Sequence, residues 1–304
     1  MGINQSRNDN IPDDGDELKN KIPSVNFSFE KTHPSDLDNI CRSDPYMIKI
    51  CTNKNFIEKY LEYWNLEIPN LNNINKYKND IHEQYQGLPL PFAIMGTYII
   101  KIMKTQSYIL INYLLDNVDF TNSIYPSSDY NLISFNFYKP EIIFNLFQDN
   151  INDEDLINLI SRLPLNDLYV ADKIAGFGTF EVARKNRPKL LRWLIDNNLL
   201  RYEDLFINLV ALKNNEKFIE MNDFIKESES NEYNKINWKN VLNKAIIKGN
   251  LDVIDIIFEI TKNTSKINWL QEINNWSYFL NSEFGPMSDY DKEAIERMNY
   301  LLKL

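Results

Sequence analysis

Residues 245–261, AIIKGNLDVIDIIFEIT, decide the fold class of this chain. A short apolar segment ends before Gly249, and a second apolar segment begins at Leu251. Within the second segment the apolar residues recur at the spacings of three and four that are typical of one face of a helix. The stretch therefore predicts two short helices joined by a polar turn at Gly249.

The same pattern recurs at four places upstream, in residues 102–117, 134–150, 183–198 and 210–227. Each of the five copies contains two adjacent apolar residues: Ile109-Leu110, Ile142-Ile143, Leu190-Leu191, Phe218-Ile219 and Val253-Ile254. These pairs lie 33, 48, 28 and 35 residues apart. A helix pair of about 33 residues cannot bury its apolar face alone and has to stack on its neighbours. An internal repeat is therefore predicted.

Residues 93–262 resemble ankyrin repeats, because LDVIDIIFE at 251–259 stands where that family has its EVVxLLLE helix. The resemblance implies an all-α, ankyrin-like helical repeat solenoid. No copy has the TPLH opening of the family, and the long interval holds an extra segment at 156–180. An ordinary helical bundle remains the alternative, since most globular helices have an apolar face.

Three sequence details carry local predictions within this region. Pro140 and Pro188 suit the first turn of a helix, where no backbone donor is lost. The lone GxG in AGFGTF, residues 175–180, has neither a GxxG continuation nor a following Lys, so it is expected to form a tight turn rather than a phosphate-binding loop.

Residues 36–61 resemble the second half of an F-box, the segment that docks on the adaptor subunit of cullin ubiquitin ligases. The matching positions are Leu37, Ile40, Cys41, Ile50, Cys51, Phe56 and Leu61. The resemblance implies that Leu37, Ile40, Ile50 and Phe56 contact the adaptor. The opening helix of the family is missing, and a small helical cap that shields the first repeat would show the same apolar spacing.

These patterns together predict the organisation of the chain. Its expected parts are a disordered tail (1–24), a small helical F-box-like module (35–68), a linker (69–92), ankyrin-like repeats (93–262) and C-terminal capping helices (263–304). In the last part, five apolar residues are expected on one face of a helix: Ala294, Ile295, Met298, Leu301 and Leu302.

The N-terminal MGINQS fits the myristoylation pattern, with Gly2 as the acceptor and Ser6 at the favoured position. A chance match is the alternative for so short a motif. The tail is acidic after Arg7, and one acyl chain binds membranes only marginally. At most a weak, reversible membrane attachment is expected.

The composition excludes several classes of function. The net charge is -10, so nucleic acid is not expected as a partner. Two Cys and two His residues are too few for a disulfide framework, a zinc site or a confident catalytic set. Cys41 and Cys51 are therefore interpreted as buried thiols in a reducing, cytoplasmic compartment, and no catalytic, metal or cofactor residues are assigned.

The predicted function is protein binding through the helical repeats. Ankyrin-containing chains with an F-box-like segment resemble proteins of large DNA viruses and intracellular pathogens, which implies a host-directed effector. A substrate adaptor of a cullin ubiquitin ligase and a structural virion component are the alternatives. An enzyme is the least favoured class, since no motif supplies a nucleophile, a base or a metal set.

Overall fold

The computed structural model describes residues 28–70, 72–120, 133–147, 151–227, 233–264, 266–281 and 289–303. These residues contain fifteen α-helices, and their only strands are β1 (Val118–Asp119) and β2 (Ile133–Ser134), which form one short parallel pair. The prediction of an all-α chain is therefore confirmed. The chain divides into two compact units, unit 1 (Met1–Glu67) and unit 2 (Ile68–Leu304). The predicted tail at 1–24 lies outside the described residues.

Unit 1 contains short helices that follow one another closely. They are the 3-10 helices η2 (Phe29–Lys31) and η3 (Pro34–Asp36) and the α-helices α1 (Leu37–Arg42), α2 (Pro45–Cys51) and α3 (Lys54–Tyr63). Asp44 caps α2 by accepting the backbone N–H of Tyr46 at 2.7 Å. Asn53 caps α3 in the same way. Local capping by short polar side chains thus sets where these helices begin.

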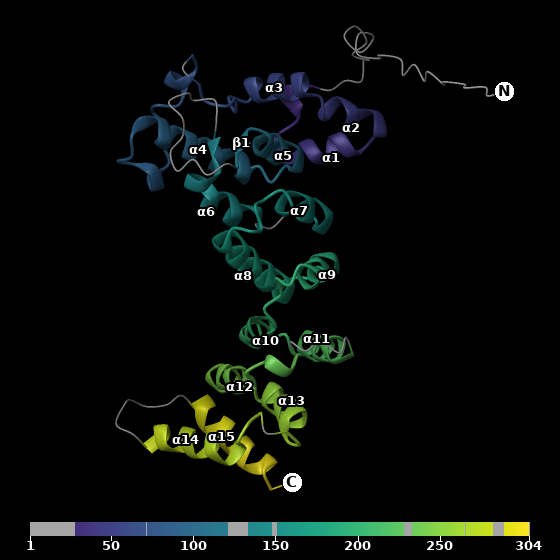
Figure 1. Cartoon of the computed structure of the whole chain (residues 1–304), viewed down its shortest axis with the longest axis vertical. Helices are drawn as coiled ribbons and strands as arrows, with labels where there is room; N and C mark the ends of the chain where they lie inside the picture. The colour runs from purple at the N-terminus through teal and green to yellow at the C-terminus, as the bar shows by residue number, and fades with distance from the viewer. Residues whose placement is uncertain are drawn as a thin grey trace, which may run out of the picture. The chain divides into compact units, whose positions relative to one another are not determined.

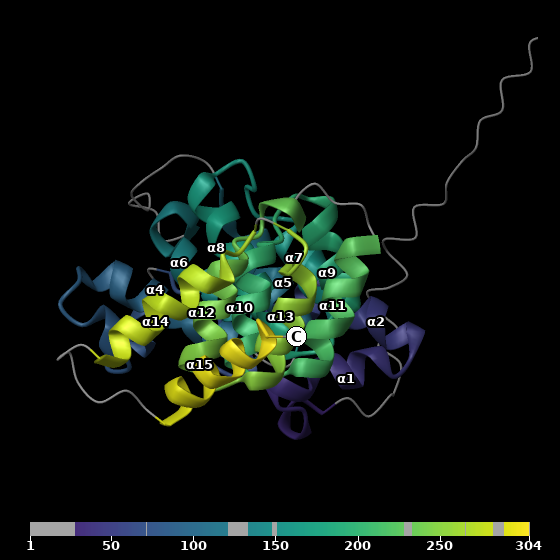
Figure 2. The ribbon, with the colours of Figure 1, turned by 90° about the horizontal axis from the view of Figure 1, so that it is seen from below.

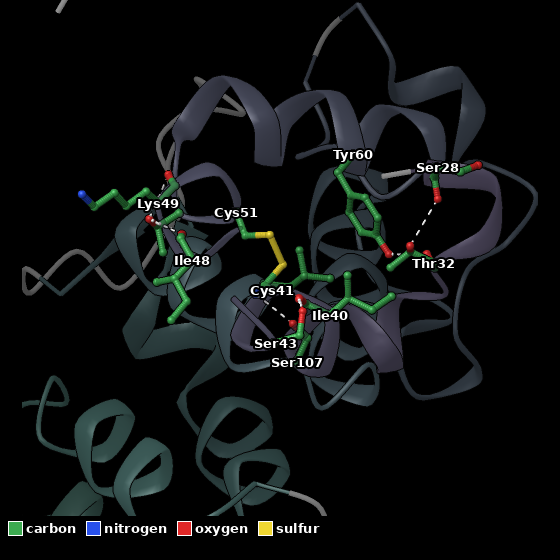
Figure 3. Close-up of a disulfide and its surroundings, with 12 residues drawn as sticks. Ser28, Thr32, Ile40, Cys41, Ser43, Ile48, Lys49, Cys51, Tyr60 and Ser107 are labelled. Atoms are coloured by element: carbon green, nitrogen blue, oxygen red, sulfur yellow. Dashed lines mark hydrogen bonds between the residues drawn. A yellow bond between two sulfur atoms is a disulfide. The ribbon is translucent and has the colours of Figure 1, made fainter. Parts of the chain in front are cut away.

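A disulfide bond joins Cys41 of α1 to Cys51 of α2 in the core of unit 1 (Figure 3). Both residues are fully buried. The interpretation of two free thiols is wrong, because the α1–α2 turn brings the two Cα atoms to 5.9 Å, within the range that a disulfide spans.

Unit 2 consists of consecutive helix pairs, which Figure 1 and Figure 2 show from two directions. The first helices of the pairs form the first series: α4 (Leu90–Lys104), α6 (Phe135–Leu146), α8 (Leu168–Arg184), α10 (Tyr202–Ala211) and α12 (Trp238–Ile247). Their partners form the second series: α5 (Tyr108–Asp116), α7 (Asp153–Ile160), α9 (Pro188–Asp196), α11 (Asn215–Glu227) and α13 (Leu251–Thr261). Each helix of the first series contacts the next, and in the second series α5, α7 and α9 contact in turn, as do α11 and α13.

Three of the turns within these pairs have the same construction. A residue with a left-handed backbone lies two positions before the second helix: Gln106 (φ 56°), Lys213 (φ 54°) and Gly249 (φ 58°). The next residue accepts a backbone N–H three positions on: Ser107 from Leu110 at 3.3 Å, Asn214 from Lys217 at 3.3 Å and Asn250 from Val253 at 3.4 Å. The chain therefore builds one local structure three times.

The copy predicted at 134–150 is not a helix pair. Pro140 lies inside α6, so its prediction as a first-turn residue is wrong, whereas Pro188 does begin α9. The helix continues through Pro140 because Tyr138 and Ile142 on either side are fully buried, which offsets the lost backbone hydrogen bond. Ile142 and Ile143 thus belong to the first series. The second-series helix is α7, which begins three residues before the segment interpreted as an insertion and ends within it.

The AGFGTF segment is helical as well, and the predicted tight turn is wrong. Gly176 and Gly178 both lie inside α8. An added Cβ at Gly178 would lie 3.0 Å from both methyl groups of Leu194 in α9. Gly178 therefore lets α8 and α9 approach closely, and the burial of Ile174 and Val182 stabilises the helix against its two glycines.

Arg187, at the start of α9, contacts residues of both α7 and α8. Its Nη1 donates to the carbonyl oxygen of Ile151 at 3.0 Å and to Asp153 Oδ1 of α7 at 3.3 Å. Its Nε lies 3.5 Å from Glu181 Oε2 of α8. Arg187 and Glu181 are both buried, so the ion pair fixes α7, α8 and α9 relative to one another.

The ends of unit 2 are packed too. The segment predicted as a linker, 69–92, contains η4 (Ile74–Lys76), η5 (Glu83–Tyr85) and the start of α4, and the rings of Tyr77 and Tyr85 are buried. At the other end, η6 (Tyr233–Lys235) precedes α12, and α14 (Trp269–Asn281) and α15 (Asp289–Leu301) follow α13. Helix α15 contacts α12, α13 and α14. Of the five apolar residues predicted on one face of this helix, all but Leu302 are buried.

Candidate protein-binding groove

Two adjoining hollows lie over the first-series helices of unit 2. The larger, of about 690 Å³, is lined mainly by α6, α8 and α10. The smaller, of about 450 Å³, is lined by η5, α4, α6 and α8. The two hollows share Phe144, Lys173 and Phe177 in their walls, so we treat them as one groove.

Aromatic side chains form much of this groove. Phe144 of α6 is 53% exposed and Phe180 of α8 is 41% exposed. The ring of Phe177 lies between the two helices, 5.7 Å from the ring of Phe144 and 5.9 Å from that of Phe147. Gly176 has no side chain, which leaves space beside Phe177 and Phe180. Exposed aromatic residues that gather in a hollow are typical of protein-binding sites.

The charges in the larger hollow are mostly paired. Arg201 of α10 forms ion pairs with Asp172 of α8 and, at 3.6 Å, with Asp204 on its own helix. Glu181 is buried and accepts from Arg184 Nη2 at 2.6 Å. This end of the groove is therefore close to neutral.

The smaller hollow contains two lysines with weaker partners. Lys104, at the end of α4, is exposed and has no ion pair or hydrogen bond within the part of the chain that the structure describes. Lys173 lies 3.8 Å from Asp172 and has its ammonium group 5.4 Å above the ring of Tyr169. The carboxylate here is Glu141, which accepts from Gln84 Nε2 at 2.7 Å.

Glu141 also acts on a neighbouring tyrosine. Burial, followed by the charge of Glu141, raises the pKa of Tyr85 well above its usual range. Tyr85 is buried and is not among the residues that line the groove, so it adds no charge to the surface of the groove.

The histidines serve local structure. His33 and His82 cap the 3-10 helices η3 and η5, where each Nδ1 accepts a backbone N–H two residues on, at 3.3 and 3.4 Å. Across the described residues, no three His, Cys, Asp or Glu side chains gather in a way that could hold a metal ion. None of the described helices has both the length and the apolar character that crossing a bilayer requires.

The residues singled out by the F-box resemblance all lie in unit 1. Leu37 and Ile40 belong to α1, Ile50 to α2 and Phe56 to α3. Leu37 is fully buried, whereas Ile40, Ile50 and Phe56 are half-buried. The ring of Phe56 lies 5.6 Å from that of Phe29. Gly2, the predicted lipidation site, lies outside the described residues.

Sequence reasoning missed the groove. Its α8 residues Tyr169, Lys173, Phe177 and Phe180 recur at spacings of three and four, which would have indicated one helix face if 168–184 had been interpreted as a helix. Phe144 was missed because it lies in α6, where the pattern was interpreted as a turn followed by a short helix. The signal was therefore present but assigned to the wrong elements.

No protein-family model, curated protein or solved structure matches this chain.

Proposed function

We propose that this chain is an interaction protein that binds a partner protein through the groove of unit 2. The observation that carries the proposal is the exposure of Phe144 and Phe180 in a hollow that crosses successive first-series helices. Burying such side chains against a partner would remove large apolar surfaces from water, which stabilises complexes.

An ankyrin-like helical repeat is the architecture that we propose for unit 2. Its support is the order of contacts along the two series of helices and the turn that recurs at Gln106, Lys213 and Gly249. Stacked helix pairs present their first helices side by side, so that one partner can contact several of them at once.

The test compares the proteins captured by three versions of the full chain, each expressed in the cells in which the protein naturally occurs. The versions are the wild type, a variant with two substitutions in the groove, and a control variant. We expect Phe144→Asp combined with Phe180→Asp to lower the capture of a specific partner by about tenfold or more, because exposed aromatic anchors carry much of the binding energy. Leu270→Asp is the matched control, since Leu270 is 62% exposed on α14 and lies outside the groove.

Circular dichroism of each version checks that the fold is retained. A partner that is captured equally by all three folded versions would show that the groove is not its binding site. Loss of a partner only in Leu270→Asp would indicate that the binding site lies at the C-terminal end of unit 2.

A substrate adaptor of a cullin ubiquitin ligase is the second candidate. The half-exposed side chains of Ile40, Ile50 and Phe56 leave part of the F-box-like surface accessible in unit 1. On this proposal a cullin-ligase subunit co-purifies with the chain and is lost in an Ile40→Asp, Phe56→Ala variant. Failure to recover any such subunit with the wild-type chain, or equal recovery with the folded variant, would contradict it.

A further inference from the structure

The two ends of the groove differ in charge. At the α4 end, Lys104 and Lys173 line the smaller hollow, and Glu141 is the one carboxylate in its described wall. Lys173 also lies 3.8 Å from Asp172, which belongs to the wall of the larger hollow. Glu141 is already hydrogen-bonded to Gln84. At the α10 end, Arg201 forms ion pairs with both Asp172 and Asp204. Arg184 and Arg201 are thus paired with carboxylates, whereas Lys104 has no ion pair in the described part of the chain, so the α4 end carries the excess of positive charge.

This positive end lies directly beside the apolar surface. Phe144, Lys173 and Phe177 line both hollows. A partner side chain that packs on the two phenylalanine rings would therefore lie in the same part of the groove as Lys173. Lys104, at the end of α4, lines the same smaller hollow. A partner thus meets an apolar surface and two cations in one place.

The rest of the chain makes this contrast stronger. The chain as a whole has a net charge of -10, so its overall field repels an acidic partner. Complementary charge at one place and repulsion elsewhere determine where a partner binds and which partner is accepted.

We infer that the groove binds a protein segment that carries a large apolar anchor residue next to one or more carboxylates. The anchor lies against Phe144 and Phe177, and the carboxylates face Lys104 and Lys173. This inference rests on the proposed function and specifies the chemistry of the partner.

The experiment selects ligands from a displayed library of random short peptides on the immobilised full chain. The expected result is enrichment of peptides that combine a large apolar residue with neighbouring Asp or Glu, and loss of that enrichment with Phe144→Asp. In a second selection, Lys104→Glu combined with Lys173→Glu should enrich Lys or Arg beside the apolar residue instead.

A selected acidic peptide, made synthetically, then measures the contribution of each lysine. Lys104→Gln and Lys173→Gln should each weaken its binding by about 1.4- to fivefold, the range measured for exposed ion pairs, and added salt should reduce the difference. Lys248→Gln is the matched control, because Lys248 is an exposed lysine at the end of α12, outside the groove. It should leave the affinity unchanged.

The outcomes separate this inference from the proposed function. Apolar peptides that depend on Phe144 but show no acidic preference, or that respond equally to Lys104→Gln and Lys248→Gln, would overturn the inference and leave protein binding at the groove intact. Selection of no peptide that depends on Phe144 would overturn both.

Discussion

Two glycines in α8 offer a matched pair of substitutions that tests the packing of the helix pairs. Gly176 and Gly178 are two residues apart in the same helix, and neither has a left-handed backbone. An added Cβ at Gly176 has no atom within 4 Å, whereas one at Gly178 lies 3.0 Å from both methyl groups of Leu194. Leu194 is fully buried in α9. The main difference between the two sites is therefore what the new methyl group contacts.

Two opposing effects set the size of the change. Replacing glycine by alanine inside a helix stabilises it by about 0.8–1 kcal/mol. Gly176→Ala should keep this gain, which corresponds to about 2–4 °C in Tm for a unit of this size. Gly178→Ala must displace Leu194, and overpacking of a core costs about 1–3 kcal/mol. Its net effect should lie between no change and a loss of about 2 kcal/mol.

The measurement is urea unfolding of the full chain and of both variants, followed by far-UV circular dichroism, with amide hydrogen exchange to localise the change to α8 and α9. A third variant, Gly178→Ala with Leu194→Val, should recover part of the loss, because the shorter side chain makes room for the methyl group. If the AGFGTF segment were a turn with left-handed glycines, both alanine variants would be destabilised. Equal destabilisation at Gly176 and Gly178 would therefore refute the helical assignment and the close α8–α9 contact.

Three further predictions follow from buried or capping residues. Ile254→Asp should destabilise the C-terminal helix pairs by more than about 4 kcal/mol, because a charge would replace a fully buried side chain. If the amides of α12 to α15 exchanged as slowly in the variant as in the wild type, this prediction would be contradicted. Replacing Cys41 and Cys51 by alanine should lower the free energy of unfolding of unit 1 by about 3 kcal/mol, the chain-entropy value for a loop of 10 residues. Wild-type protein should show no free thiol until it is reduced. An unfolding midpoint that does not change on reduction would argue against the bond. A hydrogen bond from Lys139 lowers the pKa of Asp167, so Asp167 stabilises the folded state above its ordinary pKa and this contribution is lost as the pH falls. Asp167→Asn should flatten the acid limb of stability against pH measured by urea unfolding, and an unchanged limb would disprove the coupling.

The sequence predicted most of the second series of helices and little of the groove. Helices α9 and α13 have clear apolar faces that begin at Pro188 and Leu251, so periodicity and a start signal agree there. In α6 and α8, Pro140 and the glycines of AGFGTF are turn signals that tertiary packing overrides. Predictions from helix-breaking residues therefore fail where the burial of apolar neighbours on both sides of the proline or glycine outweighs the destabilisation that this residue causes in a helix.

The groove and the disulfide could not be predicted for different reasons. The groove combines Lys104, Phe144 and Phe177, which lie on three helices that are far apart in the sequence, and only the stacking of those helices brings them together. The pairing of Cys41 with Cys51 depends on the tight α1–α2 turn. The total number of cysteines gives no information about the geometry of that turn.

Photo-crosslinking identifies which surface of the chain contacts the partner. A photoreactive phenylalanine analogue replaces Phe144 in the groove or, in separate chains, the exposed residues Leu270 of unit 2 and Ile48 of unit 1. Each chain is irradiated in cells of its source. If the groove binds the partner, a partner protein should be crosslinked from position 144 and not from positions 270 or 48. Crosslinking of the partner from position 270 or 48 alone would contradict binding through the groove.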